Sequence, residues 1–159
     1  MQRASPDFRD WDRLLELLRA AFAYQEQRVN PPSSVYKLDA RSLAEKSSQE
    51  HLFLASVARE LAGCVFVSER PPSLYVSKLA VWPHLQGRGI GRHLMIAVEV
   101  FARESGHMVL ELETRVELTE NHRTFKSLGF NKVSEHAHEG YDHPTYVRMR
   151  KSLGAVPGA

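Results

Sequence analysis

The chain has 159 residues, 43% of them hydrophobic, which is enough for one globular domain with a real core and too few for two. Its 21 basic and 19 acidic residues are interspersed, and this argues against a nucleic-acid-binding protein, whose affinity would rest on clustered Lys and Arg. No hydrophobic stretch approaches the roughly 20 residues of a membrane span, and the start, MQRASPDFRDW, lacks the apolar centre of a signal peptide, so we expect a cytoplasmic protein without a membrane partner.

The first third of the chain reads as two helices joined by a loop. Apolar residues recur at helical spacing from Trp11 to Phe22, and Asp7 or Asp10 is expected to cap this helix. The segment RVNPPSSVYKLDA breaks the regularity and predicts a loop, and ARSLAEKSSQ then predicts a short second helix. A long loop and a short helix at this place often shape the entrance to a site.

From His51 the sequence changes to strands. The segments 51–58, 61–69 and 73–82 are separated by turns and predict an antiparallel meander. The one cysteine, Cys64, lies in the apolar run AGCVFV. We interpret it as a buried structural thiol, because no partner base for a nucleophile is identifiable.

The second half predicts a crossover. An apolar stripe from Ile90 to Phe101 indicates a helix that ends at Gly106, and HMVLELE is the next strand. A strand, a glycine turn, a helix and a second strand make a crossover unit, so 74–82 and 107–113 should be parallel neighbours.

The remaining pattern completes a mixed α/β (α+β) fold. Thr119 opens a short helix closed by Gly129, and two final strands follow near NKVSEHA and TYVRMRK. We expect one domain over residues 1–151, with a central, mostly antiparallel sheet of about six or seven strands flanked by helices. Residues 152–159 lack an apolar pattern and are expected to form a loose tail.

The glycine-rich stretch HLQGRGIGRHL is the most informative motif. A dinucleotide fingerprint would need glycine where Arg92 stands, and a nucleotide P-loop would need a Lys followed by Ser or Thr. What remains is Q-x-x-G-x-G at the start of a helix, where Gly89 and Gly91 free the backbone to approach an anion. The loop fits a pyrophosphate, although a plain connector would also use glycines.

Two motifs carry a resemblance to a known family. The segment VSKLAVWPHLQGRGIGRHLM resembles the acetyl-CoA loop of the GNAT acyltransferase superfamily, and LTENHRTFKSLGF is similar to the short helix and Leu-Gly-Phe turn that follow the next strand there. Together the motifs cover residues 74–130, and the flanking strands extend the resemblance over nearly the whole chain. The resemblance implies a GNAT-like fold whose parallel strand pair splays around acetyl-CoA.

The resemblance also implies how coenzyme A is bound. The glycine loop would wrap the pyrophosphate, the backbone of Leu79–Val81 would pair with the pantetheine arm, and an amide near Leu79 or Val81 would stabilise the thioester oxyanion. Arg88 and Arg92 are candidate phosphate partners, with exposed surface residues as the alternative. The expected cofactor-binding residues are Leu79, Ala80, Val81, Gln86, Gly87, Arg88, Gly89, Ile90, Gly91, Arg92, Asn121 and Phe125.

The catalytic residues depart from the family pattern. Many members place a tyrosine near the sulfur as the general acid, but the matching residue here is Phe125, which has no proton to give. Tyr141 and Tyr146 are candidate replacements, and solvent can also protonate a thiolate. A base carboxylate often stands on the strand before the glycine loop, where this chain has Lys78.

The role of base is therefore expected to move to another residue. Glu113, at the end of the next strand, is the leading candidate, and Glu111 on the same face is the runner-up. The segment SEHAHEGYDHPT contains three histidines, but no metalloenzyme spacing is complete, so we expect a polar substrate-facing loop and no metal.

We predict an acetyl-CoA-dependent N-acetyltransferase that acts by direct transfer on a small-molecule amine or peptide. The alternatives are an acyl-CoA-binding sensor without turnover and a structural domain without acyl-CoA affinity. Acidic residues in LDARSLAEKSSQE and SEHAHEGYD hint at a cationic amine. By family analogy, a homodimer paired through the edge of the last strand is a further expectation.

Overall fold

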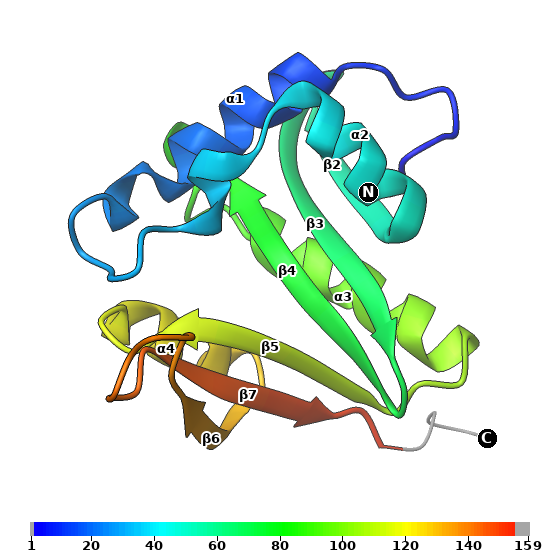
Figure 1. The fold of residues 1–159 in the computed structure, drawn as a ribbon. Helices are drawn as coiled ribbons and strands as arrows, with labels where there is room; N and C mark the ends of the chain where they lie inside the picture. The colour runs from blue at the N-terminus through cyan, green and yellow to red at the C-terminus, as the bar shows by residue number, and fades with distance from the viewer. Residues whose placement is uncertain (1, 155–159) are drawn as a thin grey trace.

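The computed structural model describes residues 2–154, which form one seven-stranded sheet flanked by helices (Figure 1). The order of the strands across the sheet is β1-β2-β3-β4-β5-β7-β6. The strands are β1 (Gln2–Arg3), β2 (His51–Val57), β3 (Glu60–Arg70), β4 (Ser73–Val81), β5 (Val109–Arg115), β6 (Asn131–His136) and β7 (Tyr146–Ser152). The helices are α1 (Trp11–Phe22), α2 (Ala40–Gln49), α3 (Ile90–Glu104) and α4 (Thr119–Ser127), and the short 3₁₀ turns are η1 (Ala23–Gln25), η2 (Ser34–Lys37) and η3 (Pro83–Leu85).

The sheet confirms the predicted meander and crossover. Strands β2, β3 and β4 pair antiparallel in chain order, and β4 and β5 are parallel neighbours joined through α3. Their pairing is short, because only Ser73–Tyr75 of β4 lie opposite Val109–Glu111 of β5. Beyond these residues the two strands separate, and Figure 1 shows them diverging as a V.

Both faces of the meander are buried. One core lies between the sheet and α1 with α2, where Leu14 and Leu18 pack with Phe66. The other lies between the sheet and α3, where Leu94 and Val98 are among the fully buried side chains. Successive residues of β3 enter opposite cores, which explains why its apolar run is continuous rather than alternating.

The structure corrects three details. Asp10 stands at the N-cap of α1 but its side chain makes no capping bond there, whereas Asp39 caps α2 by accepting from the amide of Ser42. The two-residue strand β1 was not predicted, because two residues carry no periodicity. The last strand, β7, lies between β5 and β6, so it offers no free edge through which copies of the chain could pair.

The first residues of the expected tail continue from the last strand. Ser152 belongs to β7, and Leu153 is only 7% exposed within the core against α3. Leu153 of the expected tail is therefore packed, whereas Ser152 is exposed, and residues 155–159 lie outside the described part of the chain. Over residues 2–154, no helix combines the length and the apolar character needed to cross a membrane.

Candidate active site

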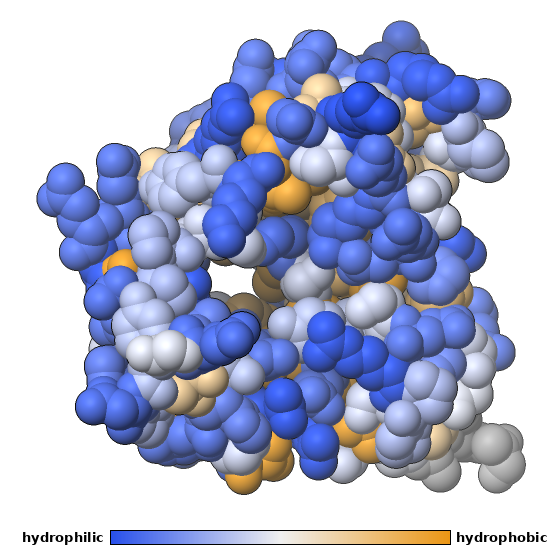
Figure 2. All heavy atoms as spheres, in the orientation of Figure 1, coloured by the Kyte–Doolittle hydropathy of each residue, from blue (hydrophilic) through white to orange (hydrophobic). Residues whose placement is uncertain are grey.

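The divergence of β4 and β5 opens a cavity of about 980 Å³. It is lined by both strands, by the glycine loop with the start of α3, by α4, and by the segment that joins α1 to α2. Figure 2 shows the molecule hollowed at this place, between the segment after α1, β4 and β5. The volume falls in the upper range of small-molecule sites, for which about 300–1,000 Å³ is usual.

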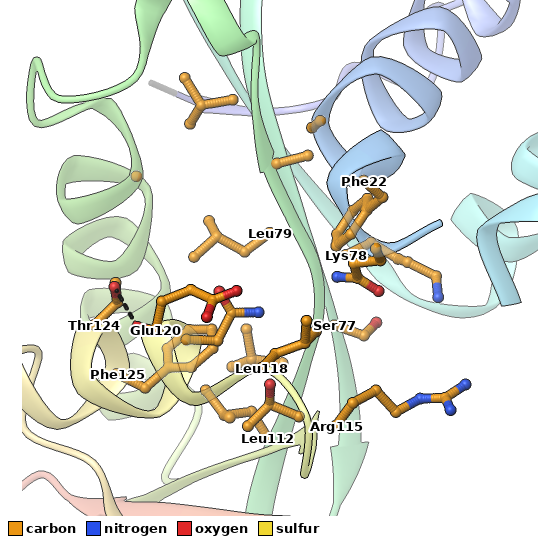
Figure 3. Close-up of a pocket in the computed structure, with 18 of the residues that line it drawn as sticks. Phe22, Ser77, Lys78, Leu79, Leu112, Arg115, Leu118, Glu120, Thr124 and Phe125 are labelled. Atoms are coloured by element: carbon orange, nitrogen blue, oxygen red, sulfur yellow. Dashed lines mark hydrogen bonds between the residues drawn. The ribbon is translucent and has the colours of Figure 1, made fainter. Parts of the chain in front are cut away.

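A bulge in β4 shapes the centre of the cavity. Cys64 of β3 lies opposite Ala80 and Phe66 lies opposite Ser77, so β4 carries one residue more than β3 between these pairs. Within the bulge, Lys78 has a φ of 55°, in the left-handed region that lysine seldom adopts. The normal alternation is interrupted as a result, and Figure 3 shows Ser77 and Lys78 on the same side of β4, opposite Leu79.

The glycine loop closes one end of the cavity. Gly87 and Gly89 have φ values of 82° and 83°, which only glycine adopts at little cost, and Gly89 is the N-cap of α3. No side chain among residues 2–154 caps this helix, so the amides of its first turn are left without a partner there. The side-chain amide of Gln86 donates to the carbonyl of Val81 at 3.1 Å and ties the loop to β4. The loop is therefore suited to bind an anion.

The cavity has an apolar wall and a polar wall on opposite sides of the sheet. Leu112 of β5 points into the core against α3, and because side chains alternate along a strand, Glu113 points to the other face. Figure 3 shows Leu79, Leu118 and Phe125 on the first side of β4, and Phe22, Ser77, Lys78 and Arg115 on the second. A ligand entering at the loop would meet the apolar wall, and a second ligand could approach from the polar one.

The structure brings together most of the residues predicted to bind the cofactor. All of them line the cavity except Arg88, which lies outside it. The side-chain amide of Asn121 in α4 donates to the hydroxyl of Tyr24 in η1 at 2.9 Å, and both residues line the cavity. Phe125 packs edge-on against Phe130, with ring centroids 6.0 Å apart, and adds an apolar surface but no proton donor.

Of the two predicted candidates for the base, one lines the cavity and the other does not. Glu113 lines the cavity, and one of its carboxylate oxygens lies 3.8 Å from both Arg70 and Arg148. Glu111 does not line it, because it is buried against Arg148 and Arg150 at 3.0 and 3.1 Å. The geometry separates these two carboxylates, although they share one face of β5.

Only one of the two tyrosines proposed from the sequence as the general acid lines the cavity. Tyr141 lies outside the cavity lining, and its hydroxyl donates to the side-chain oxygen of Asn30 at 2.8 Å. Tyr146, the second candidate acid, does line the cavity, as does Tyr75, which the sequence analysis missed. Burial, with a contribution from nearby Glu113, raises the pKa of Tyr75 to about 12, so its hydroxyl keeps its proton at neutral pH. The alternation of side chains along β4 could have predicted the place of Tyr75, because it lies two residues before Ser77 and therefore on the same face of the strand.

The segment between α1 and α2 is fastened across the cavity by polar contacts. The guanidinium of Arg115 donates to the carbonyl oxygens of Pro31 and Pro32 at 2.6 and 3.1 Å. Arg28 of the same segment pairs with Glu120 of α4 at 2.8 Å. The expected entrance loop thus forms part of the site itself, a role that depends on contacts between residues more than 80 positions apart.

Lys78 is a titratable group of the cavity whose pKa its environment lowers. Burial, with smaller contributions from Lys46 and Arg115 and an opposing one from Glu50, lowers this pKa to about 8. Its ammonium donates to the Ser34 hydroxyl at 2.5 Å. The charged side chain is therefore expected to cost stability, as buried cations without a carboxylate partner do.

We expect Lys78→Met to raise the free energy of unfolding near neutral pH by about 1–3 kcal/mol, because methionine is of similar length and has no charge to desolvate. The pKa of Lys78 is lower in the folded chain than in the unfolded chain, where it is about 10.5, so the unfolded state binds more protons between these values. The cost of the charge is thus fully present below pH 8 and shrinks as the pH rises toward 10.5. Urea unfolding of the unchanged protein and of Lys78→Met, at neutral and at alkaline pH, measures the difference in the free energy of unfolding. Equal stability of the two proteins at neutral pH would contradict the prediction.

The histidines do not form a metal site in the described residues. Across residues 2–154, no three His, Cys, Asp or Glu side chains gather in a metal-binding group. His138 lines the cavity, His136 stacks on Tyr146, and His143 pairs with Asp142 at 3.0 Å.

Cys64 is fully buried, and burial raises the pKa of its thiol to about 12, in agreement with a structural role.

Comparisons with known proteins agree with this geometry. The sequence profile described as "Acetyltransferase (GNAT) family" matches residues 11–130. The aminoglycoside N(6')-acetyltransferase type 1 of Stenotrophomonas maltophilia is 32% identical over 66 residues, which are 42% of this chain and 43% of that enzyme. The chain therefore aligns with less than half the length of that relative.

Two solved structures show the same fold. The PaiA N-acetyltransferase of Thermoplasma acidophilum, in complex with coenzyme A, has a TM-score of 0.73 at 14% identity over 90% of this chain and 92% of that one. An aminoglycoside 6'-N-acetyltransferase complexed with coenzyme A has a TM-score of 0.72 at 17% identity over 99% of both chains.

Proposed function

Because this chain belongs to the acetyltransferase (GNAT) family, we propose that it transfers the acetyl group of acetyl-CoA directly to a primary amine of a small molecule or peptide. The observation that carries the proposal is the cavity itself. It begins at the glycine loop, follows the separated strands β4 and β5, and is lined by side chains from both faces of the sheet. Such a cavity can hold two substrates end to end, as direct transfer requires.

The residues of the glycine loop fit coenzyme A. A side chain at Gly87 or Gly89 would meet no protein atom within 4 Å, so both glycines leave open space on the side where phosphates would bind. The free amides at the start of α3 would bind the pyrophosphate. Within the described residues, β4 has no strand paired on its β5 side beyond Tyr75. The backbone of Leu79–Val81, apart from the Val81 carbonyl that accepts from Gln86, is therefore available to pair with the pantetheine amides.

The polar wall would supply the proton transfers. A neutral amine attacks the thioester carbonyl, a C–N bond forms, the C–S bond breaks, and coenzyme A leaves as a thiolate. Glu113 is our candidate for the base that takes the proton of the amine, directly or through water. Tyr146 or solvent would protonate the thiolate, since Phe125 cannot and Tyr141 lies outside the cavity.

The test is acetyl-CoA-dependent release of free thiol across a panel of amines, with cofactor binding measured by calorimetry on the same sample. Two relatives act on aminoglycosides by their names, so kanamycin belongs in the panel beside polyamines, amino acids and N-terminal peptides. Release with one acceptor class supports the transferase. Tight binding without release would instead favour an acyl-CoA-responsive module, and Phe125→Tyr would be the next variant to examine.

A further inference from the structure

The two cations on the polar wall have no carboxylate partner. Lys78 donates to the Ser34 hydroxyl, and Arg115 donates to the carbonyl oxygens of Pro31 and Pro32. Within residues 2–154, neither side chain has an Asp or Glu oxygen within 4.0 Å. The Arg115 guanidinium has five N–H donors, so these two bonds leave it further donors to offer.

The two carboxylates that line the cavity are, in contrast, already matched by arginines. Glu120 pairs with Arg28 at 2.8 Å, and Glu113 lies 3.8 Å from both Arg70 and Arg148. The charge left without a partner around the cavity is therefore positive. Burial lowers the pKa of both Lys78 and Arg115, and Arg115 adds to the effect on Lys78, while Glu50 opposes it at Lys78 and Glu117 at Arg115.

The acidic residues that hinted at a cationic acceptor serve other contacts. Asp39 caps α2, Glu45 pairs with Arg41, and Glu50 pairs with Lys46 at 2.6 Å. None of them lines the cavity. The hint from the sequence thus loses its support, because the carboxylates that are clustered in the sequence do not line the cavity.

We propose that the acceptor is a small primary amine that also carries an anionic group, foremost a carboxylate, which Lys78 and Arg115 bind while the amine faces Glu113. This inference rests on the proposed acetyl transfer and names its substrate class. A planar guanidinium is well matched to a carboxylate, and the ammonium supplies a second charge. A polycationic aminoglycoside would bring several positive charges to a wall that already has two uncompensated ones, so the specificity of this chain differs from that named for its relatives.

The experiment compares amines that differ only in the anionic group. The probes are phenylalanine with phenylalanine amide, β-alanine with its amide, and O-phosphoethanolamine with ethanolamine; kanamycin and spermidine are the polycations. Binding of each probe is measured by calorimetry in the presence of coenzyme A, and thiol release with acetyl-CoA is measured in parallel. The phosphate pair separates recognition of any anion from recognition of a carboxylate.

We expect the acid of at least one pair to bind about tenfold or more tightly than its amide, the gain usual for hydrogen bonds to charged groups. In Lys78→Met, the ratio of the affinity for the acid to the affinity for its amide should fall toward one. Arg115→Met should have the same effect, and Arg115→Lys, which keeps the charge, should restore part of the preference. The matched control is Arg41→Gln, which removes a cation that is 89% exposed on α2 and should leave the preference unchanged.

Three results would overturn the inference. Equal binding of acid and amide in all pairs, tighter binding of kanamycin or spermidine, or no binding of any anionic probe would each contradict it. Binding of the acids without thiol release would leave the anion site supported and would count against the proposed acetyl transfer alone. The two proposals can therefore fail separately.

Discussion

Replacing Gly91 with glutamate is expected to lower the affinity for acetyl-CoA by about 100-fold or more, while the domain stays at least as stable. Gly91 lies in the first turn of α3 and lines the cavity, and an added Cβ would make only an ordinary contact with Val81 at 3.9 Å. A carboxylate there would occupy the place of the pyrophosphate and repel it. The same carboxylate suits the positive end of the helix dipole, and any residue other than proline is a better helix former than glycine.

The opposite signs of the two effects make this variant informative. Binding is measured by calorimetry with acetyl-CoA and stability by urea unfolding, so a loss of affinity cannot be ascribed to a loss of folding. Gly91→Gln is the matched control, because it has nearly the same shape without the charge and should retain more affinity than Gly91→Glu. If the affinity of Gly91→Glu equalled that of the unchanged protein, the glycine loop would not be the phosphate site.

Replacing Glu113 with glutamine is expected to lower kcat by about 100-fold or more, the usual contribution of a positioned general base. Glutamine preserves the shape of the side chain, so acetyl-CoA binding should change little. The loss should be smaller at alkaline pH, where more of the amine is already neutral and needs no base. The measurement is kcat across the pH range with an acceptor found in the thiol-release panel.

The control for Glu113 is its neighbour Glu111, two residues earlier on the same face of β5. Glu111 is buried between Arg148 and Arg150 and lies outside the cavity, so Glu111→Gln should lower stability by leaving these arginines without their partner. Glu111→Gln should not change the shape of the dependence of kcat on pH. An equal fall in kcat for both variants, without a change in either pH profile, would show that Glu113 acts through structure rather than as the base.

Much of the architecture could be predicted from the sequence, because it depends on local pattern. The helical period from Trp11 to Phe22, the alternation after His51 and the strand-glycine-helix order around Gly89 each act over a few residues. The parallel pair followed from the handedness and connection rules that govern crossovers, and the structure confirms it. The bulge at Lys78 could not be predicted, because it arises from the register between β3 and β4.

The form of the glycine loop could be read from the sequence, since positive φ values and an uncapped helix start are properties of glycines at one place in the chain. Which charges in the site are compensated depends instead on tertiary contacts. Glu111 and Glu113 look alike in the sequence, yet one is enclosed by arginines and the other faces the cavity. Lys78 and Arg115 lie on one wall of the cavity although they are 37 positions apart, because their strands β4 and β5 both line it. Charge pairing depends on distances of a few ångströms between distant segments, and no local pattern specifies those distances.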